Sequence, residues 1–236
     1  MTYSVTPILT GVRSPDQGIM TYQQGYGKRI WLPIWVFLIQ GEGKNILVDT
    51  GLDENEFFVP DEFEKETGLV AKSLVEGLAD HNLNPKDINI VINTHLHDDH
   101  CGNNALFPNA TFYVHKEELA FCKSPHPIDH RYDEYFIEET DFVEIQDDTE
   151  IMPGIDAVVS PGHTVGCLSI LVDTGQGKVA ITGFCCNKEN FPDNGPAVCP
   201  GVHIDAMAAW DSIQKIKDMD VTIMPMHELT IKPVAG

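Results

Sequence analysis

The sequence is poor in positive charge. Its 236 residues include 36 Asp and Glu but only 15 Lys and Arg, which leaves a formal net charge of −21 at pH 7. A field this negative repels phosphate backbones and anionic membrane surfaces, so we expect no nucleic-acid or membrane partner. Long hydrophobic runs are also absent: the most apolar stretch, Ile30–Ile39, contains Pro33 and is half as long as the ~20 residues that span a bilayer.

A signal peptide and a regular cysteine framework are missing as well. The opening residues, Met1 to Thr6, have neither the basic start nor the apolar block of a secretory signal. The six cysteines follow no regular spacing, and two of them, Cys185 and Cys186, are adjacent. We therefore expect a cytoplasmic protein whose thiols are free or bind metal.

The chain is long enough, and with 42% hydrophobic residues apolar enough, to bury a core without disulfides. Short apolar runs predict strands in both halves, with amphipathic helices between them. The expected strands are Ser4–Leu9, Trp31–Ile39, Asn45–Val48, Ile88–Ile92, Ala110–Val114, Phe142–Ile145, Ala157–Ser160, Cys167–Val172, Val179–Thr182 and Val221–Met224. This order predicts an α/β protein of two packed sheets covered by helices, as one domain over residues 1–236.

Helical periodicity is confined to three places. The expected helices are one that carries Val70, Leu74 and Leu78, one over Lys116–Cys122 and one opened by Asp205. Residues 124–140, in contrast, have no clean period and combine two prolines with aromatic and acidic side chains. We interpret this segment as a long surface excursion, of the kind that often forms a functional lid.

Three imidazoles and two carboxylates crowd the segment that follows one apolar strand. It reads Thr94-His95-Leu96-His97-Asp98-Asp99-His100. Imidazole and carboxylate are ligands that Zn²⁺ prefers and that iron and manganese also accept. In a tight turn, His95 and His97 converge on one ion while Asp99 and His100 face a second. A single histidine here would suit a solvated loop, but the H-x-H-x-D-H spacing favours a metal site.

Two more histidines also follow apolar strands. Pro161-Gly162-His163-Thr164 comes after Ala157–Ser160, and His227 comes after Val221–Met224. Alone, each is more often an ordinary turn or core histidine. Three histidine sites at strand ends in one chain favour convergence on a common centre.

These motifs resemble the metallo-β-lactamase-fold hydrolases, and within them the N-acyl-homoserine lactonase-like and 4-pyridoxolactonase-like members. The resemblance covers nearly the whole chain. Beyond the histidine motifs it includes Leu47-Val48-Asp49-Thr50-Gly51, Cys101-Gly102-Asn103, Lys188-Glu189-Asn190-Phe191 and Val202-His203-Ile204-Asp205. It implies a four-layer αβ/βα sandwich with the metal site at one edge of the paired sheets.

The resemblance also implies roles for single residues. The implied ligands are His95, His97 and His163 for one ion and Asp99, His100 and His227 for the other. Asp49 would be a carboxylate that orients a ligand imidazole, although the sequence alone equally allows a turn aspartate. His203 lies in a segment that lines the substrate pocket of relatives, so it either contacts substrate or packs within its loop.

The chain departs from this family at one ligand. Relatives usually place an aspartate that bridges the two metals after the strand equivalent to Val179–Thr182, whereas this chain reads Gly183-Phe184-Cys185-Cys186. The missing carboxylate aligns with Gly183 or Phe184, and neither side chain can bridge. A tyrosine that contacts substrate in the lactonases aligns with Cys186.

Three arrangements of the metal site remain open. A thiolate of Cys185 or Cys186 enters the site as a ligand, since cysteine binds zinc well. Alternatively, solvent alone bridges two ions, or the site binds a single ion; the two cysteines are then small buried apolar residues. We expect one or two divalent ions, with zinc favoured and iron or manganese also accepted.

The expected chemistry follows from the metal. A bound cation lowers the pKa of water from 15.7 to about 7, and the resulting hydroxide attacks an ester carbonyl polarised by the other ion. Asp99 then passes a proton to the leaving oxygen. We expect a metal-dependent hydrolase that opens a lactone or related cyclic ester, with quorum quenching as the role that the resemblance implies.

Two rival functions share the histidine motif. A thioesterase of the glyoxalase-II type is one, although Lys188–Phe191 and Val202–Asp205 favour the lactonase. A non-hydrolytic metal-binding protein is the other, if loss of the bridging carboxylate marks lost hydrolysis. The expected partner is a small-molecule substrate, and a homodimer is implied by the resemblance alone.

Overall fold

The computed structural model describes residues 2–236 and contains two β-sheets. The first sheet has the order β1-β2-β3-β4-β5-β6, with β1 Ser4–Arg13, β2 Leu32–Gly41, β3 Lys44–Val48, β4 Ile90–Ile92, β5 Thr111–His115 and β6 Phe142–Ile145. The second has the order β11-β10-β9-β8-β7, with β7 Thr149–Met152, β8 Ile155–Val159, β9 Leu168–Thr174, β10 Gly177–Ile181 and β11 Thr222–Met224. The α-helices are α1 Asp61–Thr67, α2 Leu74–Ala79, α3 Asp98–Cys101, α4 Lys116–Cys122 and α5 Ala206–Lys217.

The main hydrophobic core lies between the two sheets. It joins Phe37 and Ile92 of the first sheet to Ile170 and Ile181 of the second, and all four side chains are buried. Apolar side chains on the inner faces of two sheets interdigitate in this way when the sheets pack face to face.

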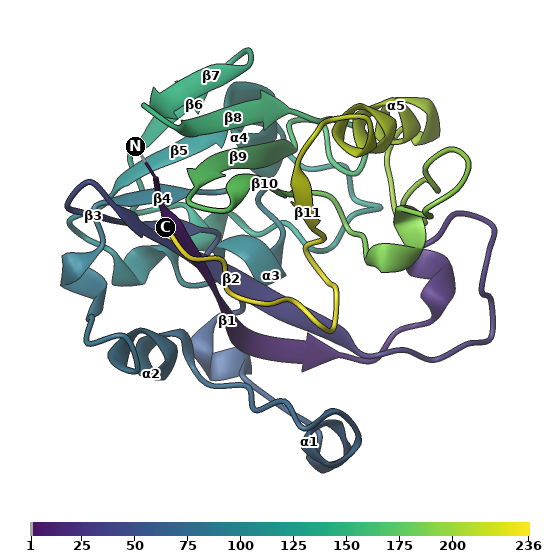
Figure 1. Cartoon of the computed structure of the whole chain (residues 1–236), viewed down its shortest axis with the longest axis horizontal. Coiled ribbons are helices and arrows are strands. Elements are labelled where there is room, and N and C mark those ends of the chain that lie inside the picture. Colours follow the sequence, from purple (N-terminus) through teal and green to yellow (C-terminus); the bar gives the residue numbers. More distant parts are fainter. Residues whose placement is uncertain (1) are drawn as a thin grey trace.

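Helices cover the outer faces of both sheets (Figure 1). On the first sheet, Leu38 and Val91 pack with Leu74 and Leu78 of α2. On the second sheet, Leu171 and Ala180 pack with Ile213 and Ile216 of α5. The layers are therefore helix, sheet, sheet and helix, which confirms the expected α/β sandwich. No helix within residues 2–236 has the length and apolarity needed to cross a membrane.

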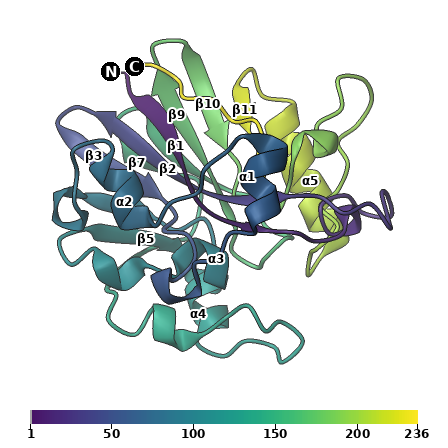
Figure 2. The same cartoon turned by 90° about the horizontal axis from the view of Figure 1, so that it is seen from below.

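Strand direction brings several loops to one edge of the sandwich. Strands β3 and β4 pair in parallel, so the segments that begin at Asp49 and Asn93 leave the first sheet at the same edge. Strands β10 and β11 also pair in parallel, and the loops after them carry Cys185 and His227. The two ends of the described chain meet elsewhere, where Val5 pairs with Val234 (Figures 1 and 2).

The expected elements differ from the observed ones in a few places. The helix expected to carry Val70 begins only at Leu74, because Ser73 and Glu76 form a capping box there and Val70 is exposed. Helices α1 and α3 and strand β7 were not expected. Within residues 124–140 the structure has a single short 3-10 turn, Glu134–Phe136. Residue 1, part of the expected domain, lies outside the described residues.

Candidate metal centre

Five histidines and one aspartate converge at the edge where these loops meet. They form two clusters, His95 with His97 and His163, and Asp99 with His100 and His227. Within each cluster the ligand atoms all lie within 4.8 Å of one another, and all six side chains are buried. The clusters adjoin, since the ring centroids of His95 and His100 are 4.0 Å apart.

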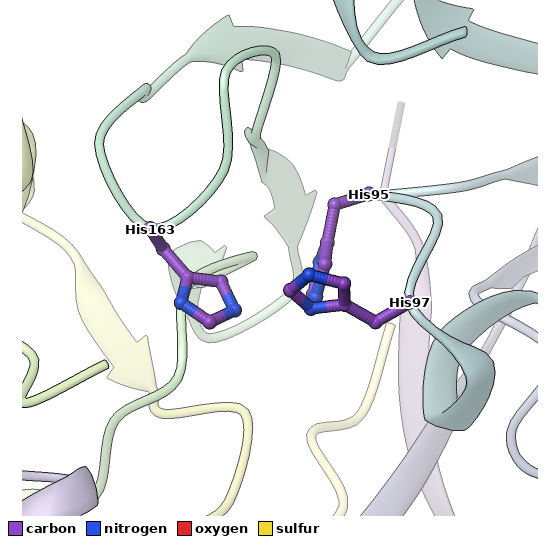
Figure 3. Close-up of side chains that lie close together, drawn as sticks. All are labelled: His95, His97 and His163. Atoms are coloured by element: carbon purple, nitrogen blue, oxygen red, sulfur yellow. The ribbon is translucent and has the colours of Figure 1, made fainter. Parts of the chain in front are cut away.

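Each cluster draws on both sheets. His95 and His97 follow β4 of the first sheet, and Figure 3 shows their rings beside that of His163, which comes from the loop after β8. In the second cluster, Asp99 and His100 lie in α3, beyond β4, whereas His227 follows β11. The complete set exists only when the two sheets are packed together.

Hydrogen bonds fix one ring nitrogen of three of these histidines and leave the other free for a metal. His163 Nδ1 donates to the carbonyl of Val202 at 2.8 Å, and His227 Nδ1 donates to the carbonyl of Pro33 at 2.9 Å. His97 Nε2 lies 3.3 Å from the Asp129 carboxylate. Such contacts set the tautomer and the ring orientation of metal-binding histidines.

Asp49 fixes the remaining two rings. It is fully buried and accepts hydrogen bonds from the backbone N–H and the hydroxyl of Thr94, both at 2.7 Å, and from His100 Nδ1 at 2.8 Å. The Thr94 hydroxyl, with its proton directed to Asp49, accepts in turn from His95 Nδ1 at 3.0 Å. One carboxylate therefore orients a ring in each cluster.

The far nitrogen of His95 shows that the first cluster suits a metal. His95 Nε2 is buried and has no hydrogen-bond partner within residues 2–236. An unpaired buried polar atom costs about 1–3 kcal/mol, so such atoms are rare without a functional reason. Three imidazoles in one cluster, and two imidazoles with a carboxylate in the other, are ligand sets that zinc and similar divalent ions accept.

Burial keeps most of these imidazoles neutral. It is the main reason why the pKa values of His95 and His163 lie well below the usual value and that of His97 lies below it. Burial also lowers the pKa of His227 to about 4. Neutral imidazole is the form that binds metal ions, so proton release does not oppose binding at these four rings.

Asp99 is held in its charged form. Burial alone would raise the pKa of its carboxyl, but His100 and Arg13 outweigh it and hold the pKa well below its usual range. For His100, burial lowers the pKa, whereas Asp99 and Asp49 raise it and prevail. Arg13 Nη1 lies 3.7 Å from Asp99 Oδ2, so this guanidinium also holds the side chain in place.

A cavity of about 260 Å³ opens above the two clusters. Ligands of both clusters line it, together with Arg13, Leu32, Arg131, Cys185 and Val202. A small molecule that enters this cavity meets both clusters and two guanidinium groups. The arrangement therefore brings a small molecule to two clusters of candidate ligands, and ions held there could polarise a carbonyl and activate water.

The two adjacent cysteines lie in different environments. Cys185 lines the cavity, and its Sγ lies 3.4 Å from the sulfur of Met20. Cys186 packs in the hydrophobic cluster beneath α5, and its Sγ lies 3.1 Å from the Thr182 hydroxyl. Neither belongs to either cluster of candidate ligands. The structure therefore does not bring Cys186 to the cavity in which it was expected to contact substrate.

The two residues that align with the missing aspartate cannot supply it. A Cβ atom at Gly183 would lie 1.9 Å from the carbonyl oxygen of Leu168, so no side chain fits there. Phe184 is buried in the cluster beneath α5. Within residues 183–186, Cys185 alone lines the cavity.

His203 lies beside a second cavity, of about 450 Å³, and not in the first. Its Nδ1 donates to the carbonyl of Pro200 at 2.8 Å, and its ring contacts Tyr22 edge-on with centroids 5.0 Å apart. Both expected roles, substrate contact and loop packing, are compatible with this position.

Apart from Asp49, the residues that position the site without binding metal are missing from the sequence-based candidates. Asp129 and Arg131 lie in the 124–140 excursion, where no spacing marks them. Glu118 of α4 is fully buried and holds the loop between His95 and His97 through the N–H of Leu96. The only available signal was the length of the excursion, because these contacts join segments far apart in the chain.

Comparison with known proteins agrees with this geometry. The family model of the metallo-beta-lactamase superfamily matches residues 29–226. An N-acyl homoserine lactonase of Bacillus cereus is 29% identical over 215 residues, which cover 85% of this chain and 81% of that protein. The N-acyl homoserine lactonase AiiA of Bacillus thuringiensis subsp. kurstaki is 30% identical over 213 residues, covering 82% and 78%.

Solved structures extend the similarity to the fold. An N-acyl homoserine lactone hydrolase with the product N-hexanoyl-L-homoserine bound at its catalytic metal center superposes with a TM-score of 0.77 at 27% identity, covering 97% of this chain and 94% of that one. The chain belongs to the metallo-beta-lactamase superfamily and has its fold. It is a metal-dependent hydrolase.

Proposed function

We propose that this protein is a lactonase that opens N-acyl homoserine lactones or closely related cyclic esters. The observation that carries the proposal is the pair of buried ligand clusters under one cavity, with His95 Nε2 buried and without a hydrogen-bond partner in the described chain. Similarity to lactonases over most of the chain supports this substrate class. A quorum-quenching role follows if the acyl lactone is the natural substrate.

The two clusters would hold two zinc ions. The ligands are His95, His97 and His163 for one ion and Asp99, His100 and His227 for the other. Each cluster offers three protein ligands, the number that catalytic zinc sites use, so a bound ion would have room for water or substrate. The ions would supply an activated water and a Lewis acid for the lactone carbonyl.

The protein's own groups complete the reaction. Asp99 accepts a proton at its carboxylate and delivers it to the ring oxygen as the lactone opens. Arg13, 3.7 Å from Asp99 Oδ2 and 2.6 Å from Asp98 Oδ2, holds Asp99 in position for this transfer. Asp49 keeps His95 and His100 oriented, and the apolar wall at Leu32 limits access of bulk water.

Both cysteines stay outside the ligand set in this proposal. Neither thiol belongs to the two clusters, and Cys186 packs beneath α5, where burial raises the pKa of its thiol to about 12. The His and Asp side chains of the two clusters would then hold the ions without either thiol. All six cysteines are free, which favours the reducing cytoplasm as the location. Homodimer formation stays a prediction.

Parallel kinetic assays test the function. Wild type should hydrolyse N-hexanoyl-L-homoserine lactone with a higher kcat/KM than S-lactoylglutathione. The His97→Ala variant should lose this turnover and keep its circular dichroism spectrum, while the matched control His81→Ala retains wild-type rates. Elemental analysis should give two zinc ions per chain in wild type and in Cys185→Ala.

Three outcomes contradict the proposal. Faster turnover of the thioester would favour the glyoxalase-II-type reaction. Full lactonase activity in His97→Ala would remove the clusters from catalysis. Loss of one ion in Cys185→Ala would make that thiol a ligand after all.

A further inference from the structure

The cavity above the metal clusters adjoins a second cavity, and the two share lining residues. The second cavity has a volume of about 450 Å³, against about 260 Å³ for the first. Arg131 and Val202 line both. A molecule that occupies both spaces must therefore pass the Arg131 guanidinium.

The second cavity suits an apolar chain. Phe121, Ile128 and Ile204 line it. Ile128 is 79% exposed and Ile204 is 46% exposed, so these side chains have apolar surface to bury. An alkyl tail placed there would gain about 0.8 kcal/mol for each CH₂ group removed from water.

Arg131 is fixed at the boundary with part of its hydrogen-bonding capacity unused. Its Nε and Nη2 donate to the two oxygens of Asp129 at 2.7 and 2.6 Å, and its carbonyl accepts from the N–H of Asp98 at 2.9 Å. A guanidinium has five N–H donors in one plane. The two N–H groups of Nη1, which lie away from the edge that binds Asp129, have no partner within residues 2–236.

The available donors suit a neutral acceptor. The charge of Arg131 is already balanced by Asp129, whose side chain is itself buried against His97. A carbonyl oxygen accepts from Nη1 without adding charge.

We propose that Arg131 is a specificity-determining residue that donates to a carbonyl oxygen lying between the reacting ester and an apolar tail. The substrate class is then a lactone that carries an acylamino chain, in preference to a lactone that carries a plain alkyl chain. The ring lies over the metal clusters and the tail lies in the second cavity. This inference rests on the proposed lactonase function.

The test compares two substrates in one variant. Wild type and Arg131→Met are assayed on N-decanoyl-L-homoserine lactone and on γ-dodecalactone, which has an alkyl chain and no amide. The relevant ratio is kcat/KM for N-decanoyl-L-homoserine lactone divided by kcat/KM for γ-dodecalactone. Arg131→Met removes one hydrogen bond from a charged donor, so this ratio should be ~10–100-fold lower than in wild type. The matched control Arg29→Met, which changes an exposed arginine outside both cavities, should keep the wild-type ratio.

Binding measured by calorimetry separates this inference from the lactonase proposal. The probes are the ring-opened acids, N-decanoyl-L-homoserine and 4-hydroxydodecanoate, added to zinc-loaded protein. Arg131→Met should weaken binding of the first ~10–100-fold more than binding of the second, with unchanged zinc content. If wild type hydrolyses neither lactone, the lactonase proposal fails and this binding comparison still decides the role of Arg131.

Two results overturn the inference. Equal losses for both substrates and both acids would mean that Arg131 acts only by holding Asp129 and His97. If Arg131→Met lowers neither kcat/KM nor the affinity for either acid, the free N–H groups of Arg131 do not contact the substrate.

Discussion

Asp49 is the residue on which both metal clusters depend. It lies in the left-handed region of backbone conformation, with φ of 63°, directly after β3. This turn places its carboxylate where it accepts hydrogen bonds from His100 and Thr94. The Thr94 hydroxyl in turn accepts from His95. A single side chain therefore sets the orientation of one candidate ligand in each cluster.

Replacing Asp49 by its isosteric amide should weaken metal binding. In Asp49→Asn, one carboxylate oxygen becomes an NH₂ group that cannot accept from His100 or Thr94. We expect a loss of ~10–100-fold in zinc affinity, the usual effect of removing a partner of a ligand histidine. Competition with a chromophoric chelator measures it.

Asp53→Asn is the matched control, because Asp53 is four residues further on and only caps the short turn Glu54–Glu56. Its zinc affinity should equal that of wild type. Equal affinity in Asp49→Asn would show that the rings hold their orientation without the carboxylate.

The sequence predicted which His and Asp side chains cluster and one residue that supports them, Asp49, but it left the other supports unseen. His95, His97 and Asp99 form a local pattern with fixed spacing, so the chemistry is visible in a few residues. Asp129, which orients His97, lies 32 positions away in a segment without periodicity. No sequence pattern connects Asp129 with His97, because the two side chains meet only when residues 124–140 fold against the loop after β4.

Helix α4 anchors the loops of the site through one buried acid. Glu118 Oε1 accepts from the N–H of Leu96 at 3.0 Å and from the Tyr132 hydroxyl at 2.7 Å, and Oε2 accepts from the N–H of Gly166 at 3.0 Å. These donors belong to the loop that carries His95 and His97, to the excursion and to the loop after His163. The helix thus joins three segments that do not pair as strands.

Removing this carboxylate should destabilise the whole protein. Glu118→Ala leaves three donors without their acceptor, two of them backbone N–H groups, at a cost of about 1–3 kcal/mol each. We expect a fall of about 3 kcal/mol or more in the free energy of unfolding, measured by urea titration. Glu117→Ala, an exposed neighbour on the same helix, should change it by less than about 0.5 kcal/mol. Equal effects for the two variants would contradict this role.

Helices and strands were predicted correctly from the sequence where apolar side chains repeat, and were missed in segments that bury few side chains. Helix α4 begins and ends as expected, at Lys116 and Cys122. Helix α1 buries Phe63 alone, and β7 is an edge strand with no fully buried residue. Without a buried face, neither segment has the repeat that distinguishes an element from a loop.

A metal ion bound at the candidate centre would connect the two sheets in addition to their hydrophobic core. Each cluster combines ligands that follow strands of different sheets. An ion bound by such a set stabilises the packed state because the unfolded chain does not present the site. We therefore expect metal binding and the packing of the sheets to be coupled.

Chelation should lower the melting temperature. At an ion concentration near 1,000 times Kd, binding stabilises the folded state by about 4 kcal/mol. For a chain of this size that corresponds to a fall in Tm of about 10 °C on removal of the ions. Differential scanning calorimetry with and without a chelator measures it, and readdition of zinc should restore the higher Tm.

His163→Ala provides the control, because it removes the contribution of the second sheet to the first cluster. Its Tm should respond to zinc less than that of wild type. An unchanged wild-type Tm after verified removal of the ions would show that the sheets pack equally well without them.

The sequence determined the class of fold, the ligand chemistry and the edge at which the ligands meet. Alternating and apolar runs set the strands, and polar side chains at the ends of parallel strands gather at one edge of a sheet. The tertiary structure decided which side chains face the cavity. Cys185 lines it while its neighbour Cys186 is buried beneath α5, because side-chain direction in a loop depends on backbone angles that distant packing fixes. The same holds for Asp129 and Arg131, which act at this centre only because the folded excursion places them there.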